Sequence, residues 1–167
     1  HLYARRQRQM CIRDRSRLVV HKSIKDELVD KLVDMSKSLK IGPGIEKDTD
    51  LTPVISENQL HKVAGYARSG IQEGAEAAYG GKRLEREGYF MEPTVLNNVK
   101  QSMTVAREEI FGPVLSVLEY EDQEEAIDIA NDTEYGLGAG VFTKYIKKES
   151  WTASKLEAGQ VYVNKWF

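Results

Sequence analysis

Short apolar runs alternate with amphipathic stretches along most of this chain, and this alternation limits the folds that it can adopt. From residue 75 on, the runs recur roughly every 20 to 30 residues, and apolar residues three or four apart lie between the runs of the whole chain. Strands that alternate with helices in this way form parallel sheets covered by helices. We therefore expect an α/β fold with a parallel sheet flanked by helices, and strands at 17–21, 75–79, 114–120, 139–142 and 160–163.

Helix starts are predicted from polar residues that can accept hydrogen bonds from free backbone N–H groups. The expected N-caps are Ser23, Ser56, Asp122 and Thr143, and Gln59 is the expected capping-box partner of Ser56. Residues that share a helical period should face the core. They are Ile24, Leu28, Leu32, Met35 and Leu39 in the first helix and Leu60, Val63, Ala64, Ala67 and Ile71 in the second.

Proline and glycine refine two of these boundaries. Pro93 lies just before the apolar segment 94–96 and favours an edge or irregular strand there, because proline has no N–H group to donate. Gly159 follows the last predicted helix and is expected in a left-handed conformation at its end.

Composition excludes several classes of protein. With 41% hydrophobic and 30% charged residues, the chain is of the globular type. A net charge of −2 gives no broad attraction to nucleic acid or to an anionic membrane. The sequence has no apolar run of membrane-spanning length, and its single cysteine, Cys11, excludes an internal disulfide. We expect a cytoplasmic protein without a nucleic-acid or membrane partner.

The most informative motif is the octapeptide 106–113, AREEIFGP, which precedes the strand predicted at 114–120. Gly112-Pro113 ends any helix or turn and redirects the chain. A carboxylate and a phenyl ring are thus held on a stiff turn at the entrance to a strand. The carboxylate can accept hydrogen bonds from vicinal hydroxyls, and the ring can pack on a flat heterocycle.

This octapeptide resembles the cofactor-contacting turn of the aldehyde dehydrogenase superfamily. The resemblance implies that Glu109 holds the nicotinamide ribose and that Phe111 lies against the nicotinamide of NAD or NADP. Glu108 is expected to form a structural salt bridge or cap instead. Five further segments resemble landmarks of that family's catalytic domain and follow in the family's order: 16–21, 53–56, 88–96, 131–137 and 159–164.

The resemblance also implies a reaction. In that family a thiolate attacks the aldehyde, a hydride passes to NAD(P)+, and a water activated by a glutamate releases the carboxylic acid. The family places its cysteine four residues before the serine of Ser-Arg-Leu, which is position 12 here, whereas Cys11 lies five residues before Ser16. We therefore assign no catalytic residue and no metal site in this chain.

The expected organisation is a non-native or disordered tail over residues 1–15, which hold five arginines against one aspartate, and a partial catalytic domain over 16–167. The chain is predicted to be a fragment of an NAD(P)+-dependent aldehyde dehydrogenase that oxidises an aldehyde to a carboxylic acid. It is expected to be inactive alone, while its full-length parent would be a homodimer or homotetramer.

Several alternatives stay open. The chain could be a non-catalytic α/β interaction module that lacks the nucleophile, or a piece of an acylating, CoA-dependent aldehyde dehydrogenase. Asn164 and Trp166 could line an aldehyde pocket, or they could pack at a strand end and on the surface. The sequence leaves open which aldehyde is oxidised, whether the cofactor is NAD or NADP, and the oligomeric state.

Overall fold

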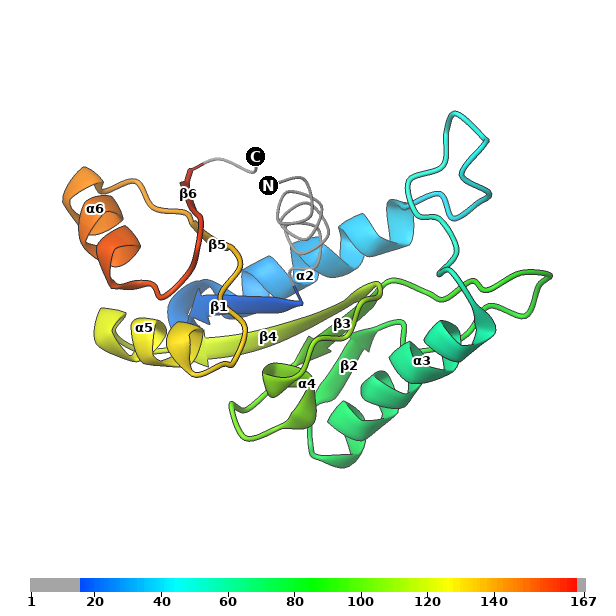
Figure 1. Ribbon diagram of the computed structural model, residues 1–167, viewed down its shortest axis with the longest axis horizontal. Coiled ribbons are helices and arrows are strands. Elements are labelled where there is room, and N and C mark those ends of the chain that lie inside the picture. The colour runs from blue at the N-terminus through cyan, green and yellow to red at the C-terminus, as the bar shows by residue number, and fades with distance from the viewer. Residues whose placement is uncertain (1–15, 165–167) are drawn as a thin grey trace. The chain divides into compact units, whose positions relative to one another are not determined.

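The computed structural model describes residues 16–164, which form two compact units, 16–119 and 120–164 (Figure 1). The larger unit contains, in chain order, β1 (Arg17–His21), α2 (Lys22–Ser38), α3 (Glu57–Gln72), β2 (Glu76–Tyr79), β3 (Thr94–Asn97), α4 (Thr104–Arg107) and β4 (Val114–Tyr120). The smaller unit contains α5 (Gln123–Asn131), β5 (Ala139–Val141), α6 (Ile146–Lys155) and β6 (Val161–Val163).

The sheet of the larger unit has four strands in the order β1-β4-β3-β2. Strands β3 and β4 are parallel, with Val95 opposite Leu115. Strand β2 runs antiparallel to β3, with Ala77 opposite Leu96, because the segment that joins them contains no crossover helix. The predicted α/β class is confirmed, and the sheet is mainly rather than wholly parallel.

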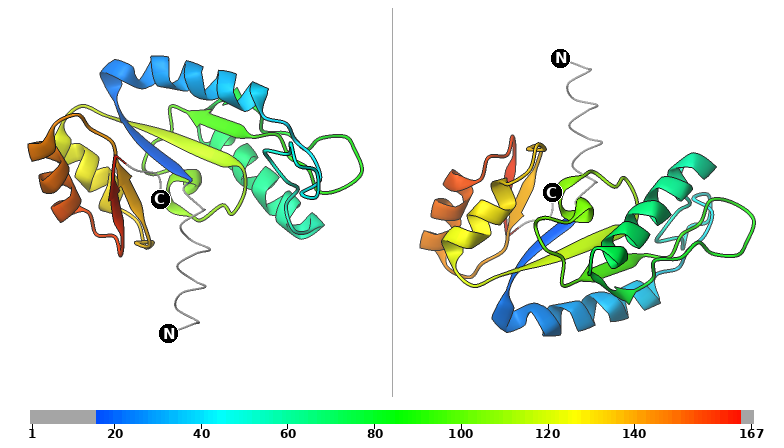
Figure 2. Two further views of the ribbon diagram at one scale, coloured as in Figure 1. Left: turned by 90° about the horizontal axis from the view of Figure 1, so that it is seen from above. Right: turned by 90° about the horizontal axis from the view of Figure 1, so that it is seen from below.

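Helices cover both faces of this sheet. Figure 2 shows α2 on one side and α3 on the other. Successive residues of β3 contact opposite faces of the sheet, because side chains alternate in direction along a strand. Val95 packs with Val29 of α2 in one cluster. A Cβ atom at Gly70 of α3 would lie 3.1 Å from Leu96, so α3 approaches the opposite face closely.

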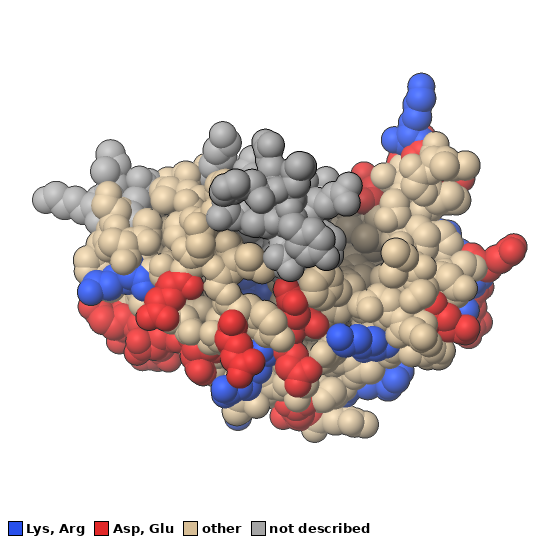
Figure 3. All heavy atoms as spheres, in the orientation of Figure 1, with Lys and Arg blue, Asp and Glu red and all other residues tan. Residues whose placement is uncertain are grey.

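The smaller unit pairs β5 with β6 in parallel, with Gly140 opposite Tyr162. The side chain of Asp122 accepts a hydrogen bond of 2.9 Å from the backbone N–H of Glu125, so Asp122 caps α5 as predicted. Acidic side chains gather over α5 (Figure 3), where two of them in the first turn suit the positive end of the helix dipole.

The start of α2 differs from the prediction. His21, not Ser23, is its N-cap, and the His21 ring accepts from the backbone N–H of Ser23 at 3.2 Å. The inward face is also shifted: Ile24 and Met35 are more than half exposed, whereas Val29 is buried. The sequence repeat alone selected a stripe that includes two residues of the solvent side.

Two other local expectations were wrong, and a third holds in part. Strand β3, which begins just after Pro93, is central rather than at an edge, but its pairing with β2 is irregular, with a register shift between Ala77 and Tyr79. Thr143 does not cap α6, because its hydroxyl accepts from the N–H of Tyr145, which is itself the N-cap residue. Gly159 does not have a positive φ, and α6 ends earlier, with Leu156 as its C-cap.

Helix α3 begins as predicted. The Ser56 hydroxyl accepts from the backbone N–H of Gln59 at 3.2 Å. Its buried residues match the prediction except that Gly70 replaces Ile71, which is 45% exposed. Within residues 16–164, no helix is both long enough and apolar enough to cross a membrane.

Candidate functional site

The octapeptide forms a turn between α4 and β4. Glu108 is the C-cap of α4, and its backbone N–H bonds the carbonyl oxygen of Thr104. Ile110 is fully buried and anchors the turn, whereas Glu109 is half-buried and Phe111 is 39% exposed. Phe111 has a φ of 50°, in the left-handed region that residues other than glycine rarely adopt.

Helix α3 holds this left-handed residue in place. The side-chain amide of Gln59 donates hydrogen bonds to the carbonyl oxygens of Ile110 at 3.3 Å and Phe111 at 2.9 Å. The next residue, Gly112, lies directly on α3, since a Cβ atom there would come within 2.5 Å of Val63. The turn is therefore fixed both by hydrogen bonds and by close packing.

Two further contacts attach the preceding segment to the same helix. The hydroxyl of Tyr66 donates to a carboxylate oxygen of Glu108 at 2.7 Å. The carboxylate of Glu73 accepts from the backbone N–H of Thr104 at 2.7 Å, at the start of α4. Glu108 was predicted to form a salt bridge or a cap; it is the C-cap residue, and its side chain bonds a tyrosine.

The Glu73 carboxyl, at the end of α3, has a displaced pKa. A hydrogen bond from the Ser69 hydroxyl, and next the bond from the backbone of Thr104, lower the pKa of Glu73 below its usual value of 4.5. Both donors favour the charged form. The charged carboxylate is thus the form that attaches α4 to α3.

The arrangement suits a flat, hydroxyl-bearing ligand. Glu109 and Phe111 flank a buried residue on an anchored turn, so an acceptor and an aromatic ring are presented with little freedom to move. A carboxylate forms charge-assisted hydrogen bonds with hydroxyls, and an exposed ring offers an apolar face. Contact of Glu109 and Phe111 with a cofactor stays a prediction.

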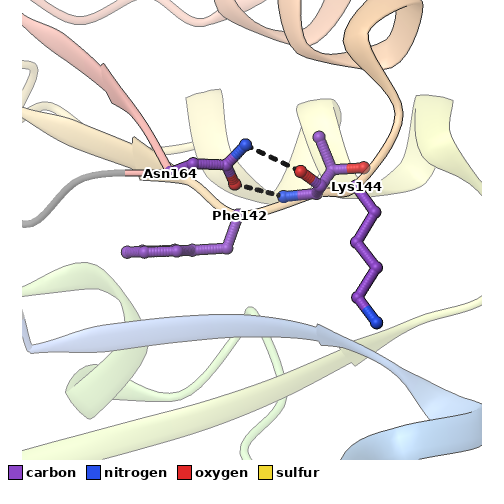
Figure 4. Close-up of a pocket in the computed structure, with 4 residues that line it drawn as sticks. Phe142, Lys144 and Asn164 are labelled. Carbon is purple, nitrogen blue, oxygen red and sulfur yellow. Dashed lines mark hydrogen bonds between the residues drawn. The ribbon is translucent and has the colours of Figure 1, made fainter.

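A second candidate region lies in the smaller unit. Phe142, Thr143, Lys144 and Asn164 line an open depression of about 600 Å³ (Figure 4). The Asn164 amide accepts from the Thr143 N–H at 2.8 Å and donates to the Thr143 carbonyl at 2.7 Å. Asn164 therefore has the predicted strand-end role, and its predicted place in an aldehyde pocket stays a prediction. Trp166 lies outside the described residues.

The remaining sequence candidates give no further site. Cys11 and the rest of the tail over 1–15 lie outside the described residues. His21 caps α2, and His61 lies 3.8 Å from Glu57 in the first turns of α3. Among the side chains described over 16–145 and 150–164, no three His, Cys, Asp or Glu gather in a group that could hold a metal ion.

Sequence reasoning missed Gln59 and Tyr66. Gln59 was assigned only a capping role, yet its side chain bonds residues about fifty positions away. Tyr66 carried no signal, because a tyrosine on a helix gives no hint of a partner 42 residues later.

Comparison with known proteins identifies the family. The model of the aldehyde dehydrogenase family matches residues 4–167. The chloroplastic betaine aldehyde dehydrogenase of Beta vulgaris is 43% identical over 151 residues, which cover 89% of this chain and 30% of that protein. This chain therefore spans about a third of the length of that relative.

Solved structures agree with the sequence match. An aldehyde dehydrogenase from Bacillus cereus in complex with NAD+ has a TM-score of 0.88 and 44% identity, over 91% of this chain and 31% of that one. A betaine aldehyde dehydrogenase from Staphylococcus aureus in complex with NAD+ has a TM-score of 0.88 and 43% identity, over 91% of this chain and 31% of that one. This chain belongs to the aldehyde dehydrogenase family.

Proposed function

We propose that this chain is part of an NAD(P)+-dependent enzyme that oxidises an aldehyde to a carboxylic acid, and that the turn at 108–113 contacts the cofactor. One observation carries the proposal. Glu109 and Phe111 reach solvent from a turn whose central residue, Ile110, is fully buried and whose left-handed backbone is held by Gln59. Strain that the surrounding structure maintains is typical of functional sites.

Each side chain has a separate role. The Glu109 carboxylate accepts hydrogen bonds from ribose hydroxyls and so fixes the sugar. The Phe111 ring packs on the nicotinamide and limits the directions from which it can be approached. The cofactor supplies the hydride acceptor when it is bound. The Glu108 carboxylate is engaged by Tyr66 and belongs to the scaffold of the turn.

The relatives support the use of a nicotinamide cofactor. The Staphylococcus aureus and Bacillus cereus proteins are described with NAD+, and the first is a betaine aldehyde dehydrogenase. This chain spans about a third of the length of these relatives. We therefore propose that turnover needs parts of the enzyme beyond the described segment, and that the 167-residue chain alone does not oxidise aldehydes.

A chimera tests the proposal. Residues 16–164 replace the matching segment of the Staphylococcus aureus enzyme, and reduction of NAD+ or NADP+ is followed with betaine aldehyde as substrate. We expect aldehyde-dependent turnover with at least one cofactor, and none from the isolated chain. A chimera that folds and binds neither cofactor would instead favour a non-catalytic module.

A further inference from the structure

Two side chains of α3 and that of its C-cap residue attach the segment 104–111 along one face of the helix. Gln59, Tyr66 and Glu73 are spaced seven residues apart, and they bond the carbonyls of the turn, the Glu108 carboxylate and the Thr104 backbone in turn. Seven residues make almost two helical turns and about 10 Å of rise, so the three side chains lie in one row. The attached segment runs antiparallel to the helix.

The three contacts differ in what they hold. Glu73 holds the first residue of α4, and Tyr66 holds a side chain of the C-cap. Gln59 bonds the carbonyl of the left-handed residue itself. The bond length of 2.9 Å to Phe111 is that of a well-formed hydrogen bond, and the second bond, to Ile110, fixes the adjacent peptide as well.

We propose that Gln59 is the positioning residue for the Phe111 ring. By holding the two carbonyls, its amide keeps Phe111 at a positive φ, and this backbone conformation sets the direction of the Cβ atom and of the ring. The inference rests on the proposed contact between Phe111 and the nicotinamide. Without the amide, the residue relaxes toward the common negative φ region, and the ring leaves the place from which it limits the approach of the nicotinamide.

The test uses the active chimera, with NAD+ and betaine aldehyde as probes. Gln59→Met keeps the length of the side chain and the helix propensity and removes the donor. We expect kcat to fall about 5-fold or more, with the KM for betaine aldehyde changed by less than about twofold. The kinetic isotope effect on kcat with deuterated aldehyde should rise, because hydride transfer becomes slower relative to other steps.

Two comparisons separate positioning from general damage. Gln72→Met is the matched control on the same helix, since Gln72 is exposed at the end of α3 and should leave kcat and the isotope effect unchanged. Gln59→Lys retains an N–H donor of similar reach and should restore kcat to within about twofold, whereas Gln59→Glu, which has no donor, should be as impaired as Gln59→Met.

A double-mutant cycle with Phe111→Gly decides between the outcomes. Glycine adopts a positive φ freely and has no ring to direct, so Gln59→Met should add no further kinetic loss in that background. If the losses in kcat from Phe111→Gly and Gln59→Met multiply in the double variant, the two residues act independently and the positioning role is overturned. A Gln59→Met chimera as fast as the Gln72→Met chimera would also overturn it. If Phe111→Gly itself leaves turnover unchanged, the proposed cofactor contact is what fails, and the positioning role fails with it.

Discussion

The hydroxyl of Tyr66 lies 2.7 Å from the carboxylate of Glu108, which ties the first acid of the Glu-Glu pair to α3. The second acid, Glu109, is half-buried on the turn beside Phe111. In the chimera, Glu109→Gln should lower the rate of hydride transfer about 5- to 150-fold, because a neutral amide is a weaker acceptor and the loss of ~1–3 kcal/mol is felt in the transition state. Steady-state kinetics with NAD+ provides the measurement.

Glu108→Gln is the matched control for this prediction. The amide oxygen of the new side chain can still accept from Tyr66, so turnover should change little. If Glu108→Gln abolishes turnover while Glu109→Gln does not, the assignment on the turn is wrong by one residue. If neither change matters, the turn has only a structural role.

Gly112→Ala should destabilise the larger unit. The new methyl group would lie 2.5 Å from a methyl of Val63, which is fully buried, and overpacking of this kind costs typically about 1–3 kcal/mol. Gly65→Ala in the middle of α3 is the control and should have the opposite effect. The nearest side chain to the added Cβ, that of Arg68, is 4.0 Å away, so alanine should stabilise the helix by roughly 0.5–1 kcal/mol. Urea denaturation midpoints measure both changes in stability. Equal midpoints for Gly112→Ala and Gly65→Ala would contradict the packing argument.

Acid should weaken the attachment of α4 through Glu73. Hydrogen bonds from Ser69 and from the Thr104 backbone lower the pKa of Glu73 below 4.5 in the folded chain. Its contribution to stability is therefore complete above about pH 4.5 and is lost as the pH falls through the lower folded pKa. Glu73 is exposed, so the effect is small. Glu73→Gln should narrow the difference between urea midpoints at about pH 7 and pH 3.5, and Glu85→Gln, at an exposed loop position, should not.

The amide of Asn164 should control exchange at the end of the small sheet. Asn164→Gly suits the φ of 48° but removes both bonds to Thr143, so the Thr143 N–H should exchange faster in hydrogen–deuterium exchange. Asn164→Asp keeps an acceptor for that N–H and should preserve its protection. Equal exchange in the two variants would show that the side-chain bond does not protect this site.

Local chemistry in the sequence predicted the parts of this fold that depend on neighbours in the chain. The caps at Ser56 and Asp122 follow from hydrogen bonds that span three residues. The apolar runs located the strands, because a short apolar run bounded by turn residues is typical of a strand. The motif at 106–113 identified the turn, because Gly-Pro limits the backbone whatever surrounds it.

The features that could not be predicted from the sequence depend on contacts between residues far apart in the chain. The inward face of α2 depends on where β1 and β3 lie, so the helical period alone could not distinguish Val29 from Met35. The second role of Gln59 is a bond to carbonyls, which every residue has, so no residue type marks the partner. The antiparallel direction of β2 depends on the path of the loop 80–93.

The row of anchors on α3 makes the length of this helix, and not only its composition, a constraint on the protein. Inserting or deleting one residue between positions 59 and 73 rotates the later anchors by about 100° relative to the earlier ones. A length change would then detach either the Glu73 end or the Gln59 end of the turn segment. Related proteins can therefore substitute residues on the outer face of α3 freely, whereas gaps in an alignment should avoid the fifteen positions from Gln59 to Glu73.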